Sequence, residues 1–156
     1  MSVHEVLLRC LTSRDYSEVM RIELESFQYA WTEDDFRNVL HDPGVVGMVA
    51  GVNGKIAGFM IYELLDDEYH LLNFAVSQNF RRQGVGTQMI EKLMARLTRN
   101  RPTLRIEVRE KNMAAQKFFS KCGFRAWEVV EEFYENPVED AYRAYRFMPV
   151  VKEAEC

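Results

Sequence analysis

Residues 81–86 read Arg-Arg-Gln-Gly-Val-Gly and stand immediately before a segment whose apolar spacing is typical of a helix. Glycine carries no side chain that would keep a ligand away from the backbone, and it adopts positive φ at little cost. A helix start offers N–H groups without intrahelical acceptors and the positive end of the helix dipole. Two cations and two glycines at this point therefore predict a site for an anionic group.

Three kinds of glycine-containing phosphate site are possible. A P-loop needs Lys and then Ser or Thr after its second glycine, whereas Thr87 and Gln88 follow here. A dinucleotide-binding fingerprint has a third glycine where this chain has Met89, although Glu107 lies at about the distance expected of its acidic residue. A turn without any ligand is a further alternative, but it does not explain the paired arginines.

The third kind of site fits best. Arg81, Gly84 and Gly86 match the (R/Q)xxGx(G/A) signature of the GNAT superfamily of N-acetyltransferases, which the chain resembles from its first predicted strand to its last. The resemblance implies acetyl-coenzyme A as cosubstrate, with its pyrophosphate held by backbone N–H groups in charge-assisted hydrogen bonds. The implied binding residues end the preceding strand and form the loop: Phe74, Ala75, Val76, Arg81, Arg82, Gln83, Gly84, Val85, Gly86 and Thr87.

Within that superfamily the chain is most similar to the RimI-type ribosomal-protein alanine N-acetyltransferases. The matching stretches are NFAV (73–76), RRQGVG (81–86), EVREKNMAAQ (107–116), KCGF (121–124) and FYENPVEDAY (133–142). This resemblance implies that Glu107 is the general base, acting directly or through water, and that Asn112 contacts coenzyme A. The chain has Phe119 where the family usually has the Tyr that protonates the departing thiolate.

Glu107 could also have a purely structural role. It alternates with the apolar residues of the segment 104–108, so it could form ion pairs on a solvated strand face. The match at Asn112 and in the glycine loop favours catalysis instead. A protein α-amine has a pKa of roughly 7.7–8.0 and attacks a thioester only when neutral, so a carboxylate that accepts its proton is useful. The flanking Arg105 and Arg109 are expected to lower the pKa of Glu107.

Phe119 cannot donate a proton, and beside Phe118 it is also expected to be a core aromatic. The thiolate could leave without a dedicated acid, because thiols ionise near pKa ~8.5. Alternatively, the hydroxyl of Tyr134 could replace the missing acid. Backbone N–H groups near Val76 are the candidates for polarising the thioester carbonyl.

The acceptor is expected between two aromatic segments, with Tyr29, Trp31 and Tyr134 lining a slot for a peptide N-terminus. RimI-type enzymes tend to have Pro before the tryptophan, and this chain has Ala30. Trp31 and Tyr134 could instead pack between helices. The preferred function is acetylation of a protein N-terminal α-amine. A small-molecule amine or a lysine side chain is the alternative acceptor, and a non-catalytic coenzyme A-binding module is the third hypothesis.

Apolar periodicity and turn residues predict the elements that position these groups. Helices are expected over 14–27, from Thr32 to about 40, over 85–97 and from Asn112 to 122. Either Glu23 or Leu24 occupies the apolar face of the first. Strands are expected over 4–11, 45–52, 55–65, 69–76, 104–108, 125–133 and 141–148. The order βααβββαβαββ predicts an α/β (α+β) single-domain GNAT fold, a mixed, mostly antiparallel sheet of about seven strands with helices on both faces. The domain is expected over 1–150, followed by a tail, 151–156.

Composition excludes several other classes. The 156 residues carry a net charge of −4, which argues against direct nucleic-acid binding. No segment has the ~18 consecutive apolar residues of a membrane span, and the N-terminus does not resemble a signal peptide. Three cysteines and three histidines without ligand spacing predict no metal site and reduced thiols, as in a cytoplasmic protein. A monomer or weak homodimer is expected.

Overall fold

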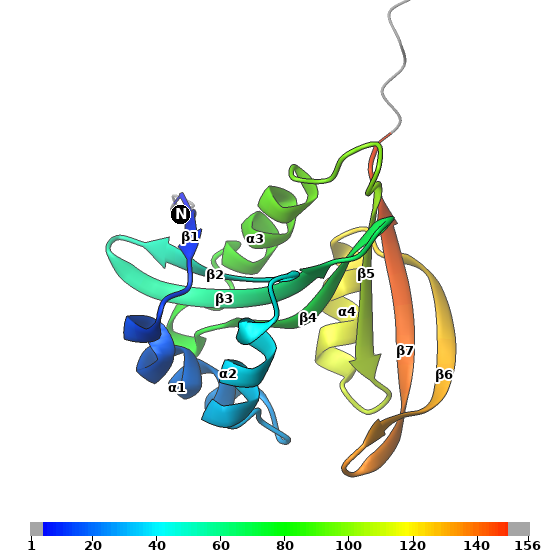
Figure 1. The fold of residues 1–156 in the computed structure, drawn as a ribbon, viewed down its shortest axis with the longest axis horizontal. Helices are drawn as coiled ribbons and strands as arrows, with labels where there is room; N and C mark the ends of the chain where they lie inside the picture. Colours follow the sequence, from blue (N-terminus) through cyan, green and yellow to red (C-terminus); the bar gives the residue numbers. More distant parts are fainter. Residues whose placement is uncertain (1–4, 150–156) are drawn as a thin grey trace, which may run out of the picture.

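The computed structural model describes residues 5–149 and contains one seven-stranded sheet in the order β1-β2-β3-β4-β5-β7-β6 (Figure 1). All neighbouring strands pair antiparallel except β4 and β5, which are parallel. The mixed, mostly antiparallel sheet and the element order are confirmed. The tail predicted over 151–156 lies outside the described residues. The strands are β1 (Leu7–Cys10), β2 (Val45–Val52), β3 (Lys55–Leu64), β4 (Glu68–Val76), β5 (Thr103–Arg109), β6 (Arg125–Glu135) and β7 (Val138–Phe147).

Within residues 5–149, four α-helices cover the two faces of this sheet, and the buried residues form two clusters. Helices α1 (Tyr16–Ser26) and α2 (Glu33–His41) pack on one face around Ile22, Phe36 and Phe59. Helices α3 (Val85–Met94) and α4 (Met113–Lys121) contribute to the larger cluster on the other face. Figure 1 shows α3 on the opposite side of the sheet from α1 and α2. No helix among residues 5–149 is long and apolar enough to cross a membrane.

Local sequence signals account for several element ends. The Thr32 hydroxyl accepts a hydrogen bond from the Asp35 N–H at 3.1 Å, and the Asp35 carboxylate accepts one from the Thr32 N–H at 2.8 Å. This capping box begins α2 as predicted. The Asn112 side chain caps α4 by accepting from the Ala115 N–H at 3.2 Å. Gly54, with φ at 78°, makes the predicted tight turn between β2 and β3.

Several predicted boundaries were wrong, among them that of the first strand, which is Leu7–Cys10 rather than 4–11. The first helix is preceded by a 3-10 turn over Ser13–Asp15, because the Asp15 carboxylate accepts from the Thr12 N–H at 2.9 Å. Helix α3 ends at Met94 rather than near 97. The last hairpin extends to Glu135 and Val138, so its loop is shorter than the predicted gap between strands.

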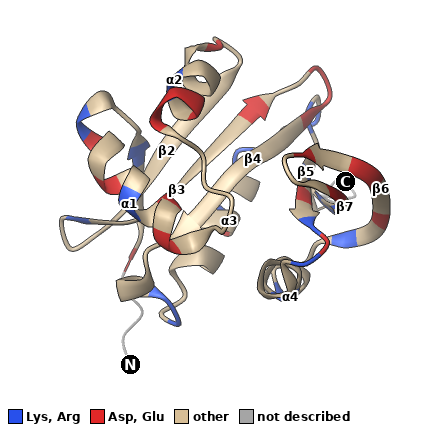
Figure 2. Cartoon of the chain, turned by 90° about the horizontal axis from the view of Figure 1, so that it is seen from below, with Lys and Arg blue, Asp and Glu red and all other residues tan. Residues whose placement is uncertain are grey.

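The β4–β5 pair separates partway along its length, and this separation positions the site. The parallel ladder joins Glu68–Leu71 to Thr103–Ile106 and ends there. On the other side of β4, the register with β3 shifts between Ile61 and Tyr62, so that Leu72 is an extra, bulged residue. Figure 2 shows β5, β6, β7 and α4 grouped on one side of the molecule, away from β2 and β3.

Candidate active site

A cleft of about 610 Å³ lies where β4 and β5 diverge. Its walls come from α1 and the loop after it, from α2, from the middle of β4, from β5, from α4 and the residue before it, and from the β6–β7 hairpin. The cleft brings together most of the catalytic and acceptor residues predicted from the sequence. Among its lining residues are Tyr29, Trp31, Phe74, Glu107, Asn112, Phe119 and Tyr134.

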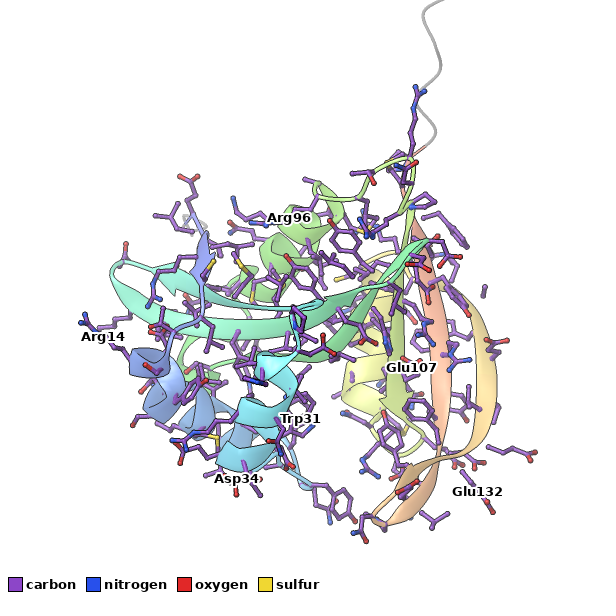
Figure 3. The ribbon with its side chains drawn as sticks, viewed as in Figure 1. Arg14, Trp31, Asp34, Arg96, Glu107 and Glu132 are labelled. Carbon is purple, nitrogen blue, oxygen red and sulfur yellow. The ribbon has the colours of Figure 1, made fainter. Side chains whose placement is uncertain are left out.

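Glu107 lies on β5 with only 3% of its side chain exposed, and three basic side chains contact its carboxylate. The Nε2 atom of His70 is 2.6 Å from Oε2, while Arg105 and Arg143 donate to Oε1 at 2.9 and 3.1 Å. Burial alone would raise the pKa of Glu107, but His70 and the two arginines outweigh it and hold that pKa below its ordinary value. Glu107 is therefore a carboxylate anion at neutral pH. Figure 3 labels Glu107 beside β5, which lies between β4 and β7 in the sheet.

A row of alternating charges crosses five strands at Glu107. Glu63 pairs with His70 across β3 and β4, and Glu107 pairs with Arg143 across β5 and β7. The Nδ1 atom of His70 is 2.7 Å from Glu63, and Arg143 lies 3.9 Å from Glu128 on β6. Burial would lower the pKa of His70, but Glu107 and Glu63 reverse that effect and raise it. The two carboxylates therefore favour the protonated imidazole, which can donate to a carboxylate on each side.

Arg109 joins the two tyrosines that the sequence assigned to the acceptor. Its guanidinium lies 4.0 Å from the ring centre of Tyr134 and 4.7 Å from that of Tyr29, distances typical of cation–π contacts. Glu139 forms an ion pair with the same guanidinium at 3.0 Å. Arg109 was predicted only as a flanking charge of Glu107, and its actual role is to hold the aromatic side of the cleft together.

Tyr134 is poorly suited to the role of general acid. Burial raises its pKa to about 12, with Arg109 acting in the opposite direction. Transferring its proton to a thiolate whose thiol has a pKa of ~8.5 would be uphill by about 5 kcal/mol. The proposal that Tyr134 replaces the missing acid stays untested, and its environment argues against it.

Trp31 and Phe119 both pack as core aromatics while they also line the cleft. The Trp31 ring meets Phe36 edge-on with centroids 5.1 Å apart. Phe119 lies edge-on to Phe74, Phe118 and Phe124 at 5.8, 5.1 and 5.3 Å. Each of the two residues therefore has the packing role that the sequence analysis considered. Each also lines the cleft, where a ligand could contact it.

The loop before α3 has the backbone geometry of an anion site. Gly84 caps the helix in the left-handed conformation with φ at 76°, and Arg82 is also left-handed with φ at 63°. The N–H of Gln88 donates to the Gly84 carbonyl at 3.0 Å. The N–H groups of Val85 and of the residues up to Thr87 precede that bond, so they have no intrahelical acceptor. Alternating left-handed residues make such amides converge on an anion.

Two residues of this loop also have packing roles that the sequence analysis missed. A Cβ atom on Gly86 would lie 3.0 Å from the Phe118 ring and 3.3 Å from Val76, so glycine allows α3 to approach α4 and β4 closely. The Arg81 guanidinium donates to the Val76 carbonyl at 3.2 Å and to the Ser26 hydroxyl at 3.1 Å. Arg81 therefore links the ends of β4 and α1, which fixes the position of the loop.

Glu23 on α1 is a further carboxyl group of the cleft, besides Glu107 and Asp35, and the sequence analysis did not identify it as a site residue. The residue is 1% exposed, and both its oxygens lie 3.0 Å from the side-chain nitrogen of Asn73. Burial raises its pKa to about 7, against the hydrogen bonds from Asn73 and from the Trp31 N–H. The sequence signal that could have identified Glu23 was the helical spacing, which allowed either Glu23 or Leu24 on the apolar face of the first helix. The structure places Glu23 inside and leaves Leu24 67% exposed.

The sequence analysis did not consider the bulge at Leu72, whose backbone could bind the carbonyl oxygen of the thioester. Backbone N–H groups near Val76 were predicted to polarise the thioester, but Val76 pairs with Gly58 in the β3–β4 ladder. Leu72 has no partner in that ladder and lines the cleft together with Glu107. The bulge is therefore a second candidate for this role.

Comparison with known proteins points to one family. The model of the acetyltransferase (GNAT) family matches residues 16–124. The [ribosomal protein bS18]-alanine N-acetyltransferase of Escherichia coli K12 is 30% identical over 125 residues, which cover 80% of this chain and 84% of that protein. A protein of Bacillus subtilis described as a putative enzyme of the same name is 26% identical over 136 residues, 86% of this chain and 90% of that one.

Solved structures agree with this result. The crystal structure of the ribosomal-protein-S18-alanine N-acetyltransferase from Escherichia coli superimposes with a TM-score of 0.79 at 27% identity, covering 97% of this chain and 99% of that one. The structure of Ard1 from Thermoplasma volcanium gives a TM-score of 0.79 at 27% identity, covering 93% and 99%.

Proposed function

The chain belongs to the acetyltransferase (GNAT) family, and from its cleft we propose that it acetylates the α-amine of a protein N-terminus. It is an acetyl-CoA-dependent N-acetyltransferase, as the sequence predicted. One observation carries the proposal for the acceptor. A buried anion, Glu107, lies in a cleft whose other wall holds Tyr29 and Tyr134 against Arg109. Such a cleft suits the amine at the end of an extended peptide, with the carboxylate as its acceptor and the tyrosines beside the peptide.

The first turn of α3 fits the pyrophosphate of the cosubstrate. Its amides have no intrahelical acceptor, and the left-handed Arg82 and Gly84 direct neighbouring N–H groups toward one side. Phe74 and Val76 on β4 supply apolar contacts for the pantetheine portion. The side-chain oxygen of Asn112 caps α4, so the NH₂ group of the same side chain is the part that would contact coenzyme A. When bound, acetyl-coenzyme A supplies a thioester whose carbonyl carbon the amine attacks.

The acceptor side depends on residues of β5 and its neighbours. The Glu107 carboxylate stays ionised, so it is proposed to accept a hydrogen bond from the acceptor's amine in the cleft. Tyr29 and Tyr134 are proposed to flank the first peptide bonds, and their hydroxyl groups can bond to peptide carbonyls. Holding the amine and the thioester in one orientation contributes most to the rate, since oriented reactions gain ~7–11 kcal/mol. The prediction that Glu107 is also the general base remains a prediction.

We infer that the natural acceptor is a ribosomal protein that begins with alanine. Support comes from the relative in Escherichia coli, which is named for the alanine of ribosomal protein bS18 and matches 80% of this chain. Such an acceptor would place the enzyme in the cytoplasm, as the sequence analysis predicted.

A thiol-release assay with acetyl-coenzyme A tests the acceptor class. The acceptors are a short peptide beginning with alanine, the same peptide with a blocked N-terminus and an internal lysine, and a free polyamine. Thiol release with the first peptide alone is the expected result. Release with the blocked peptide or the polyamine would identify the lysine or small-amine alternative, and tight binding without release would identify a non-catalytic module.

Two matched variants test the cleft. Glu107→Gln is expected to lower kcat/KM for the peptide by at least ~10²-fold, the lower end of what one catalytic group contributes. Glu128→Gln makes the same chemical change at the exposed end of the charge row and should retain most of the activity. Equal effects of the two substitutions would show that the cleft around Glu107 is not the site of the reaction.

A further inference from the structure

Arg109 is the last residue of β5 and lies where the sheet has opened. The parallel ladder between β4 and β5 ends at Leu71 and Ile106, before Arg109 is reached. Arg109 still pairs with Ala141 of β7, and its carbonyl accepts a hydrogen bond from the Asn112 N–H at 2.9 Å. The backbone of Arg109 is therefore fixed, while its side chain lines the cleft.

The Arg109 guanidinium contacts aromatic rings from two separate parts of the chain. Tyr29 belongs to the loop between α1 and α2, and Tyr134 belongs to β6. Glu139 lies directly opposite Tyr134 in the β6–β7 ladder and forms an ion pair with the same guanidinium. The Lys111 N–H donates to the other oxygen of Glu139 at 3.0 Å, which fixes that carboxylate. Arg109 thus joins two segments of the cleft lining that are far apart in the sequence.

Arginine is suited to this position in a way that lysine is not. The Arg109 side chain is 22% exposed and that of Glu139 is 8% exposed, so the ion pair between them is largely shielded from water. A guanidinium is planar and weakly hydrated, and it can keep an ion pair while aromatic rings pack against its faces. A lysine could keep the ion pair with Glu139, but it would lose the flat surface on which the rings of Tyr29 and Tyr134 rest.

The spacing between Glu107 and Arg109 matches that of an extended peptide. Burial alternates along β5, so the side chains of Glu107 and Arg109 lie on the same face of the strand. Two residues span ~7 Å along a strand, which is also the length of two residues of an extended acceptor. An acceptor with its amine at Glu107 would therefore place its second and third residues beside the tyrosines that Arg109 holds. A small amine would occupy only the position at Glu107.

We propose that Arg109 determines the preference of the enzyme for peptides over small amines, because it holds Tyr29 and Tyr134 together as one binding surface for the chain behind the amine. The inference rests on the proposed function. Arg109 is a positioning residue, since it acts through the two rings and does not touch the reacting atoms. Its loss should therefore impair long acceptors and spare an acceptor that ends next to the amine.

The first test compares kcat/KM for a tetrapeptide amide that begins with alanine and for alaninamide, which has an α-amine but no further residue. Arg109→Met should lower the value for the peptide ~10-fold, mainly through KM, because both cation–π contacts are lost, and should leave alaninamide unchanged. Arg109→Lys, which can keep the ion pair with Glu139, should act in the same way. Arg37→Met makes the same change at an exposed ion pair on α2 and should affect neither acceptor. Equal losses for both acceptors, or no loss for the peptide, would overturn the proposal.

The second test measures how strongly the two tyrosines depend on each other. Tyr29→Leu, Tyr134→Leu and the double variant are compared for the tetrapeptide in the wild-type and the Arg109→Lys backgrounds. With Arg109 present, the loss in the double variant should differ from the product of the single losses by ~3-fold or more, as for side chains that share a partner. In the Arg109→Lys background the losses should multiply. Multiplying losses in the wild type, or the same coupling in both backgrounds, would show that Arg109 does not join the rings.

A measurement on the ligand-free protein does not depend on activity. In ¹⁵N-labelled protein, the Nε–H resonance that disappears in Arg109→Lys should be shifted upfield by the ring currents of the two tyrosines. Tyr29→Leu and Tyr134→Leu should each remove part of that shift, and an unshifted resonance would refute the arrangement. Wild-type protein without any peptide-dependent thiol release would refute the proposed function itself, whereas release with equal losses for both acceptors in Arg109→Met refutes only the role of Arg109.

Discussion

Replacing Gly84 with alanine should weaken the binding of coenzyme A by more than its effect on the fold explains. Gly84 is the N-cap of α3 and has φ at 76°, in the left-handed region that L-residues with a Cβ adopt at a cost. Its conformation directs the amides of Val85 and Gly86, which we propose to bind the pyrophosphate. An alanine there will either keep the conformation with strain or relax it and redirect those amides.

The size of each effect follows from this geometry. A left-handed non-glycine residue costs roughly 1–2 kcal/mol, which should appear as lower stability of the fold. A hydrogen bond to a charged group contributes about 1.5–3 kcal/mol, so losing one amide contact should weaken binding by about 10- to 100-fold. Loss of two contacts should weaken binding further.

The assay is isothermal titration with coenzyme A, combined with urea denaturation of the same proteins. Gly54→Ala is a matched control, because Gly54 has φ at 78° in the β2–β3 turn and a Cβ added there would meet nothing within 4 Å. Both variants should lose similar stability, and Gly54→Ala should bind coenzyme A as the wild type does. Unchanged affinity in Gly84→Ala, or an equal loss in both variants, would show that the α3 amides do not hold the ligand.

Three further predictions concern the cleft. The pKa of Glu23 is raised to about 7 in the fold, so wild-type stability should fall by up to about 3 kcal/mol between pH 4.5 and pH 8, and denaturation of Glu23→Gln should lack this decline. The raised pKa of His70 means that its stabilisation is full below pH 6.5 and lost as the pH rises through the folded value; His70→Gln should therefore cost about 3 kcal/mol in urea denaturation at pH 6 and less at pH 9. Phe119→Tyr should keep or raise turnover in the thiol-release assay, because the family usually has Tyr there; a collapse of activity would contradict that alignment of α4.

Features encoded within a few residues could be predicted from the sequence. The capping box at Thr32, the turn at Gly54 and the cap at Asn112 each depend on contacts over three or four positions. The glycine loop could be recognised for the same reason, because its residue types and their spacing lie within the six residues 81–86 before α3. Glu107 was found through resemblance to a family rather than through its own strand pattern.

Features that depend on register or on packing between distant segments could not be predicted. Two of the three partners of Glu107 come from β4 and β7, and only the alignment of the strands places His70 and Arg143 beside it. Helical periodicity allowed either Glu23 or Leu24 to face inward, because both lie three or four residues from Met20 and from Phe27. The packing role of Gly86 depends on Phe118, which lies on another helix.

A crystal structure with a bisubstrate analogue, coenzyme A joined through an acetyl linker to the N-terminus of an alanine peptide, tests the arrangement most directly. We predict its pyrophosphate at the amides of Val85 and Gly86, its linked nitrogen in the cleft with Glu107, and its peptide between Tyr29 and Tyr134. A peptide located outside that cleft, for example in the hollow between α1 and α2, would contradict the account.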